Sequence, residues 1–176
     1  MKMTRLLLAT LLGGATAVVV GCRDPAPTGV DDHEPVPHAD LVSGVPFATG
    51  LLWCSPLPYD SVMQTIGTEG GMLRVGPHTL LVPPGALGEP VSITAVAPSD
   101  TVNQVRFQPE GLTFAQPAQL TMSYANCDLL GLTLPKQIAY TSNLLVILDY
   151  LKSVDNPPSQ TTTGRLEHFS TYAVAW

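Results

Sequence analysis

Short apolar stretches separated by turn residues recur along most of this chain. In residues 91–95, 120–124 and 171–176, apolar and polar side chains alternate with a period of two. This alternation is typical of a strand with one buried face. No stretch after residue 22 keeps the 3.6-residue period of a helix together with helix caps. The pattern therefore predicts an all-β chain with a strand roughly every ten residues.

Several other segments fit the same interpretation. The apolar run 144–148 is typical of a strand covered on both faces, and the polar, threonine-rich run 160–166 is typical of an edge strand. A short helix over 128–134 is the alternative for the one stretch that suits neither pattern. Because strands of this length and spacing pair by hairpins, we predict an antiparallel β-sandwich. The remaining strands are expected at residues 72–75, 79–82, 105–107 and 138–141.

The beginning of the chain is organised differently. Lys2 and Arg5 precede an apolar run over 6–20, which is followed by Val-Val-Gly-Cys at 19–22. A basic start, a short apolar run and a small residue before the cut indicate a signal peptide. The last four residues resemble the lipobox of bacterial lipoproteins, which implies cleavage before Cys22 and a stable membrane anchor of lipid on its thiol. An ordinary secretory signal with a chance cysteine is the alternative.

The anchor predicts a place in the bacterial cell envelope. In lipoproteins that resemble those of enteric bacteria, an aspartate directly after the cysteine favours the inner membrane. Here Arg23 takes that position and Asp24 follows it, so we expect an outer-membrane lipoprotein facing either the periplasm or the cell surface. The expected parts are a signal peptide over 1–21, a tether over 22–45, an N-terminal segment over 46–65 stapled to the domain, and a sandwich over 66–176.

The tether is rich in proline and acidic residues, so we expect it to be extended and disordered. It contains His33 and His38 among carboxylates, which are weak candidates for a metal site because the neighbouring prolines oppose wrapping around an ion. We expect no metal and no cofactor. The net charge of −6 becomes about −8 after loss of the signal peptide's two cations, so the charge argues against nucleic acid as a partner.

The cysteine count also depends on the anchor. With Cys22 lipidated, Cys54 and Cys127 remain. An even number of cysteines in an oxidising compartment favours a disulfide, which would staple the segment around Cys54 to the domain. Two buried free thiols are the alternative.

Four segments stand in a characteristic order, at residues 66–71, 81–87, 109–114 and 117–121. Together they resemble a ZU5 domain, the β-sandwich module of ankyrins, netrin receptors and tight-junction scaffolds. The family mostly binds proteins, so the resemblance implies a non-enzymatic module that binds a protein or a surface glycan, or that has a structural role. The turns in these segments have structural reasons, such as a positive φ at Gly70-Gly71.

The resemblance also points to one candidate for reactivity. Some ZU5 proteins cut themselves at a His-Phe-Ser sequence, which corresponds here to His168, Phe169 and Ser170. Ser170 would attack the carbonyl carbon of Phe169 while His168 takes the proton. The structural alternative is that Phe169 fills the core while its neighbours satisfy turn hydrogen bonds.

Other chemistry-bearing residues have structural explanations. We expect His78 to be exposed in a turn, and Asp149 and Asp155 to be ordinary loop charges rather than a catalytic pair. A sugar-stacking platform formed by aromatic rings is less favoured than packing in the core and rim. These rings are Trp53, Tyr172 and Trp176.

Overall fold

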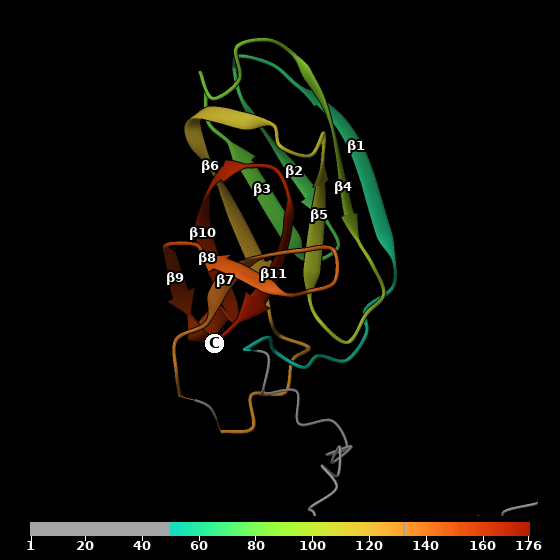
Figure 1. Cartoon of the computed structure of the whole chain (residues 1–176), viewed down its shortest axis with the longest axis vertical. Helices are drawn as coiled ribbons and strands as arrows, with labels where there is room; N and C mark the ends of the chain where they lie inside the picture. Colours follow the sequence, from blue (N-terminus) through green and yellow to red (C-terminus); the bar gives the residue numbers. More distant parts are fainter. Residues whose placement is uncertain (1–49, 132) are drawn as a thin grey trace, which may run out of the picture. The chain divides into compact units, whose positions relative to one another are not determined.

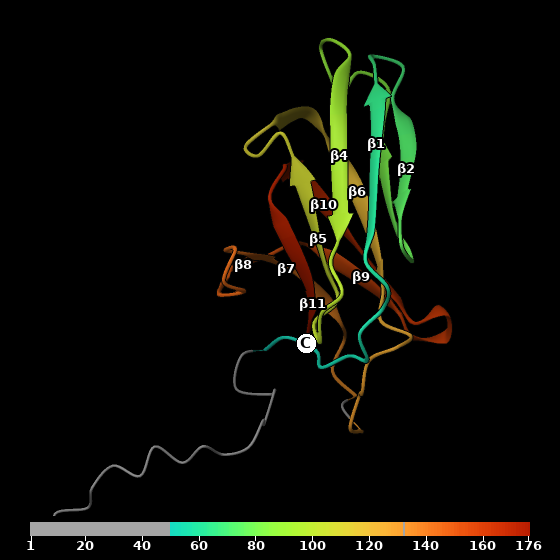
Figure 2. The same cartoon turned by 90° about the vertical axis from the view of Figure 1, so that its right-hand side faces the viewer.

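The computed structural model describes residues 50–131 and 133–176. The expected signal peptide, the lipidated Cys22, the tether and the two candidate ligands His33 and His38 lie outside these ranges. The described residues form two antiparallel sheets packed face to face, with no α-helix (Figures 1 and 2). The predicted all-β antiparallel sandwich is therefore confirmed.

One sheet has six strands in the order β1-β4-β5-β11-β7-β8. β1 and β8 are its edges, and β11 lies inside it between β5 and β7. The strand β1 was not expected from the sequence. The strand bounds are β1 Asp60–Ile66, β4 Val91–Ala97, β5 Gln104–Gln108, β7 Gln137–Thr141, β8 Ile147–Tyr150 and β11 Thr171–Ala175.

The other sheet has five strands in the order β2-β3-β6-β10-β9. β6 is the longest strand and pairs with β3 on one side and with β10 on the other. A 3-10 helix, η2 (Pro157–Ser159), links β9 to β10. The strand bounds are β2 Gly71–Val75, β3 His78–Val82, β6 Thr113–Ser123, β9 Ser153–Asn156 and β10 Thr161–His168.

The core lies between the sheets and follows the alternation that the sequence predicts. In β4, Ile93 and Ala95 are buried, and in β6, Leu120 and Met122 are buried. Residues on the inner faces of both sheets form one apolar cluster, whose burial is the main driving force for folding.

The C-terminal strand β11 lies inside its sheet and is buried on both faces. Tyr172 and Val174 point into the core as expected, and Trp176 packs against it. Ala173 and Ala175 point the other way, where Leu51 packs against them. Their small side chains allow this close approach.

Two strand predictions are wrong. Residues 144–148 do not form a strand covered on both faces: they form the tip of the β7–β8 hairpin and the start of the edge strand β8, and most of their side chains are exposed. Residues 160–166 are not at an edge, because β10 lies between β6 and β9. The threonines suit this position because Thr163 hydrogen-bonds Thr121 across the outer face, with 2.8 Å between the hydroxyl oxygens.

The alternative helix over 128–134 is absent from its described residues, which form turns and irregular chain. In the part of the chain that the structure describes, no helix is long and apolar enough to cross a membrane.

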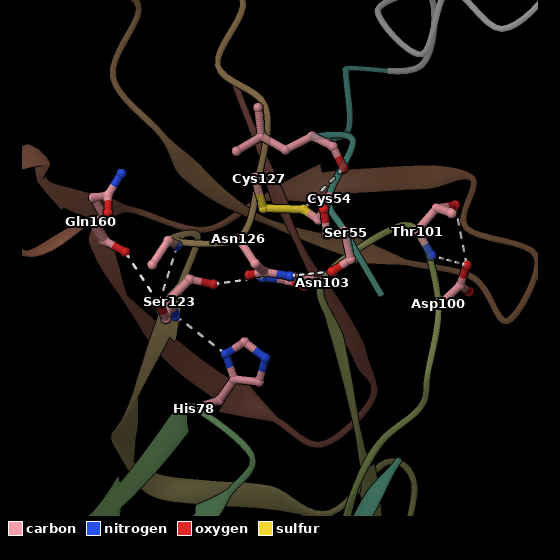
Figure 3. Close-up of a disulfide and its surroundings, with 12 residues drawn as sticks. Cys54, Ser55, His78, Asp100, Thr101, Asn103, Ser123, Asn126, Cys127 and Gln160 are labelled. Carbon is pink, nitrogen blue, oxygen red and sulfur yellow. Dashed lines mark hydrogen bonds between the residues drawn. A yellow bond between two sulfur atoms is a disulfide. The ribbon is translucent and has the colours of Figure 1, made fainter. Parts of the chain in front are cut away.

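The predicted disulfide is present between Cys54 and Cys127. It lies at one end of the sandwich, where both cysteines form an isolated antiparallel bridge (Figure 3). The backbone N–H of Leu52 donates to the carbonyl of Val174 at 3.0 Å, and that of Ser55 donates to the carbonyl of Asn126 at 2.8 Å. The segment around Cys54 is thus stapled to the sandwich, as predicted.

Candidate binding site

A groove of about 480 Å³ opens at the surface where the chain crosses from one sheet to the other. We call it the tyrosine groove, because Tyr140 of β7, Tyr150 of β8 and Tyr172 of β11 line it. The crossing residue Leu151 is held by its N–H, which donates to the carbonyl of Ile138 at 2.8 Å. The groove is completed by Asp149, Leu151, Lys152, Arg165, Leu166, Glu167 and His168.

Hydrogen bonds and ring contacts fix the floor of the groove. Tyr172 is buried, and its hydroxyl donates to the carbonyl oxygen of His168 at 2.5 Å. Burial, with a smaller contribution from Tyr140, raises the pKa of Tyr172 above its usual range, so this hydroxyl stays protonated. The rings of Tyr140 and His168 meet edge to face with their centroids 5.0 Å apart. The floor is therefore a rigid aromatic surface.

The walls of the groove carry charges of both signs. Asp149 and Glu167 supply carboxylates, while Lys152 and Arg165 supply cations, and all four residues are exposed. A groove of this kind can take up polar and charged side chains of a partner, because hydrogen bonds to charged groups are the stronger ones.

Beside the groove lies an apolar rim that we call the β8 edge, made of Leu144, Val146, Leu148 and Tyr150. Their side chains are 87%, 58%, 53% and 43% exposed. Single exposed apolar side chains are normal, but four of them within seven residues of one hairpin indicate an interaction surface. β8 pairs with β7 on one side, and no other strand of the described chain pairs with its second side.

The structure brings His168, Phe169 and Ser170 to the start of β11. Phe169 is fully buried, stacked on Phe107 and edge-on to Phe114, both with centroids 5.0 Å away. This is the core-filling role that the structural alternative gives it. The carbonyl oxygen of Phe169 accepts a hydrogen bond from the N–H of Gly111 at 2.9 Å.

The imidazole of His168 does not hydrogen-bond the hydroxyl of Ser170 in the described structure. Its Nδ1 lies 3.4 Å from the Tyr172 hydroxyl and 3.5 Å from the carbonyl oxygen of Phe169. At such distances a hydrogen bond is weak, so ring packing determines the position of the imidazole. His168 and Ser170 are two residues apart in the chain. In this arrangement, however, no hydrogen bond joins them along which Ser170 could pass its proton to His168.

His78 and Asp155 differ from what the sequence predicts for them. His78 is buried rather than exposed, because it is the first residue of β3 and points inward with Leu80 and Val82. Asp155 accepts hydrogen bonds from the Tyr124 hydroxyl at 2.7 Å and from the N–H of Lys136 at 2.9 Å, so it has a structural role.

Trp53, Tyr172 and Trp176 do not form a sugar-stacking platform. Tyr172 is buried inside the sandwich, whereas Trp53 is exposed outside it. Among residues 50–131 and 133–176, no three His, Cys, Asp or Glu side chains are grouped as metal ligands would be.

Sequence reasoning missed the groove and the β8 edge. Their residues come from four strands and two connections, so no local motif marks them. The one signal in the sequence is the apolar run over 144–148, whose hydrophobicity predicts a buried strand instead. Comparison with known proteins finds no matching family model and no matching curated protein.

Proposed function

We propose that this chain is a lipid-anchored protein of the bacterial cell envelope whose ZU5-like sandwich binds another protein through the β8 edge and the tyrosine groove. The observation that carries the proposal is the exposed apolar surface on an edge strand. The lipobox-like sequence at Cys22 supports the anchor, and the protein-binding habit of ZU5 domains supports the binding role.

A polypeptide is the partner that suits this surface best. β8 offers unpaired backbone groups on one side, and an extended segment of a partner can add to such an edge as a further strand. Leu148 and its apolar neighbours would be covered by the partner's apolar side chains. The charges at Asp149, Glu167, Lys152 and Arg165 would select the polar side chains beside them.

A glycan suits the surface less well. Sugar binding needs exposed aromatic faces on which the apolar side of a ring can stack. Of the three tyrosines in the groove, Tyr172 is buried, and Tyr140 is half-buried with its ring packed against His168. Tyr150 is the tyrosine of the three that remains substantially exposed.

A capture experiment with matched variants tests the binding role. The full-length lipoprotein is solubilised from membranes in mild detergent and used to enrich envelope proteins. The double variant Leu144→Asp/Leu148→Asp places two charges on the β8 edge. The control Met63→Asp places a charge on the opposite edge strand, β1, at a side chain that is 70% exposed.

We expect the wild type and Met63→Asp to enrich the same partner. The double variant should retain less than about a tenth of it, since losing one or two central interface contacts costs at least 1–2 kcal/mol. Equal enrichment by all three proteins would contradict the proposed surface. Enrichment of polysaccharide in place of protein would favour the glycan.

The anchor has a separate test. Cys22→Ala removes the thiol to which lipid would be attached. We expect the wild type in the membrane fraction and a loss of detergent-extractable, lipid-modified protein in the variant. Lipid labelling of the variant equal to that of the wild type would contradict the assignment of Cys22.

Self-cleavage between Phe169 and Ser170 is the second candidate, and one contact favours it. The Gly111 N–H that donates to the Phe169 oxygen is placed to stabilise negative charge on that oxygen. Attack by the Ser170 hydroxyl would break the peptide bond, form an ester and free the Ser170 amine. Water would then hydrolyse the ester to a carboxylate on Phe169 and a hydroxyl on Ser170.

Because β11 is paired on both sides, a cut would leave the C-terminal peptide bound to the sandwich. The test therefore needs denaturing conditions. Intact mass spectrometry of unfolded protein should show two species if cleavage occurs. A single species that ends at Trp176 would exclude it.

A further inference from the structure

A second cavity, of about 370 Å³, lies apart from the tyrosine groove at the end of the sandwich that holds the disulfide. The β2–β3 turn, the β4–β5 connection and the segment before β1 enclose it. Its size falls in the range of small-molecule sites. Its wall is mostly apolar, with three prolines, and includes Leu57, Pro58, Tyr59, Pro77, Ala97 and Pro98.

Several polar side chains around this cavity already have hydrogen-bond partners within the protein. The amide nitrogen Nδ2 of Asn103 donates to the carbonyl of Ser123 at 2.9 Å and to Oδ1 of Asn126 at 2.7 Å (Figure 3). Gln104 donates to Asp100 at 2.8 Å, and Asp60 accepts the N–H of Gly76 at 2.6 Å. These bonds build the wall and leave few groups free for a ligand.

His78 also lines the cavity, although the residue is only 2% exposed. Its Nδ1 accepts the backbone N–H of Ser123 at 3.2 Å, so in the neutral ring the proton is on Nε2. Figure 3 shows the second ring nitrogen turned away from Ser123. The described residues offer this Nε2–H no acceptor, and the nitrogen is not sealed inside the protein, so it can donate a hydrogen bond to a molecule in the cavity.

We propose that this cavity binds a neutral, largely apolar small molecule with a carbonyl oxygen that accepts the hydrogen bond of His78 Nε2–H. The apolar wall favours the apolar body, and the Nε2–H donor at the cavity surface favours the acceptor. The Asp60 carboxylate lines the same cavity and repels an anion, and the mostly apolar wall solvates a cation poorly, so a neutral ligand fits best. This site is distinct from the β8 edge and does not depend on the proposed protein partner.

Two fluorescent probes of similar size test the proposal. Prodan is a neutral naphthalene with a ketone oxygen, whereas N-phenyl-1-naphthylamine has no acceptor oxygen. They are titrated against the full chain carrying Cys22→Ala, which takes no lipid on that residue. We expect a saturable blue shift of Prodan emission and binding of the second probe at least about tenfold weaker, as a buried hydrogen bond predicts.

Two variants locate the site, and one serves as a control. Ala97→Phe fills the cavity and should abolish Prodan binding, whereas Met63→Phe, on an exposed position of β1, should leave it unchanged. His78→Phe should remove the preference for Prodan over the second probe. Thermal unfolding shows whether each variant is folded. If His78→Phe is not, Ala97→Phe and the comparison of probes in the parent chain still decide the matter.

Competition identifies the source of the carbonyl group. Displacement of Prodan by methyl hexanoate alone supports a free ester or ketone. Displacement by dihexanoyl phosphatidylcholine below its micellar concentration supports an ester lipid. The proposal is overturned if Prodan shows no saturable shift, if both probes bind equally, or if Ala97→Phe binds Prodan as the parent chain does.

Discussion

Loss of the disulfide between Cys54 and Cys127 should lower the stability of the folded chain. Cys54 and Cys127 are 73 residues apart. In the chain-entropy model, a cross-link over such a loop restricts the unfolded chain and stabilises the folded state by about 4 kcal/mol. The double variant Cys54→Ala/Cys127→Ala should therefore lose about 4 kcal/mol of unfolding free energy, which is a large share of the 5–15 kcal/mol of a typical domain.

The structure adds a local consequence. The bridge holds the segment whose Leu51 covers Ala173 and Ala175 of β11. Once the bridge is removed, this cover depends on the backbone bonds of the segment and on its apolar contacts. Hydrogen exchange at β11 should therefore accelerate more than exchange at β4.

The assay is equilibrium unfolding in urea, with a thermal melt beside it. We expect the transition midpoint of the double variant to fall, and its melting temperature to drop by roughly 10–20 °C. Met63→Ala, at an exposed side chain of β1, is the matched control and should change little. A loss below about 1 kcal/mol in the double variant would refute the reasoning.

Two further predictions concern pH and backbone geometry. Burial lowers the pKa of His78 from 6.5 to about 4. Between these two pH values His78 is therefore protonated in the unfolded chain but neutral in the folded chain. Its contribution to stability is present above pH 6.5 and should fall by about 3 kcal/mol as the pH drops to 4. Measured by urea unfolding, the unfolding free energy of the wild type should fall more steeply across this pH range than that of His78→Gln. Equal slopes for the two proteins would contradict the prediction. Gly70 has φ +74°, and a Cβ there would overlap the carbonyl oxygen of Val82, so Gly70→Ala should destabilise by about 2 kcal/mol or more. Gly88→Ala, with open space around it, should change stability little, and similar melting temperatures for the two variants would refute the argument.

The sequence predicts the sandwich well where one face of a strand is buried. In 91–95, for instance, the inward positions are apolar because they form the core and the outward positions are free to be polar. The disulfide could be predicted because the lipobox-like assignment of Cys22 leaves an even number of cysteines. Both inferences use local or counted features, which one sequence contains.

Features that depend on distant pairing could not be predicted in this way. The position of β10 inside its sheet is set by its pairing with β6 and β9, which its polar sequence does not reveal. The apolar side chains from Leu144 to Leu148 look like core because hydrophobicity does not say whether the burying partner is in the same chain. The burial of His78 did have a signal, since His78, Leu80 and Val82 share the period of two.

The most direct test of the proposed function is photo-crosslinking in living cells with the anchored, full-length protein. A photoreactive amino acid replaces Leu148 on the β8 edge, or Met63 on β1 as the control. We predict a discrete higher-mass adduct with one envelope protein from position 148, and none from position 63. Identical adducts from both positions, or none from position 148, would contradict the claim that the β8 edge binds a protein partner.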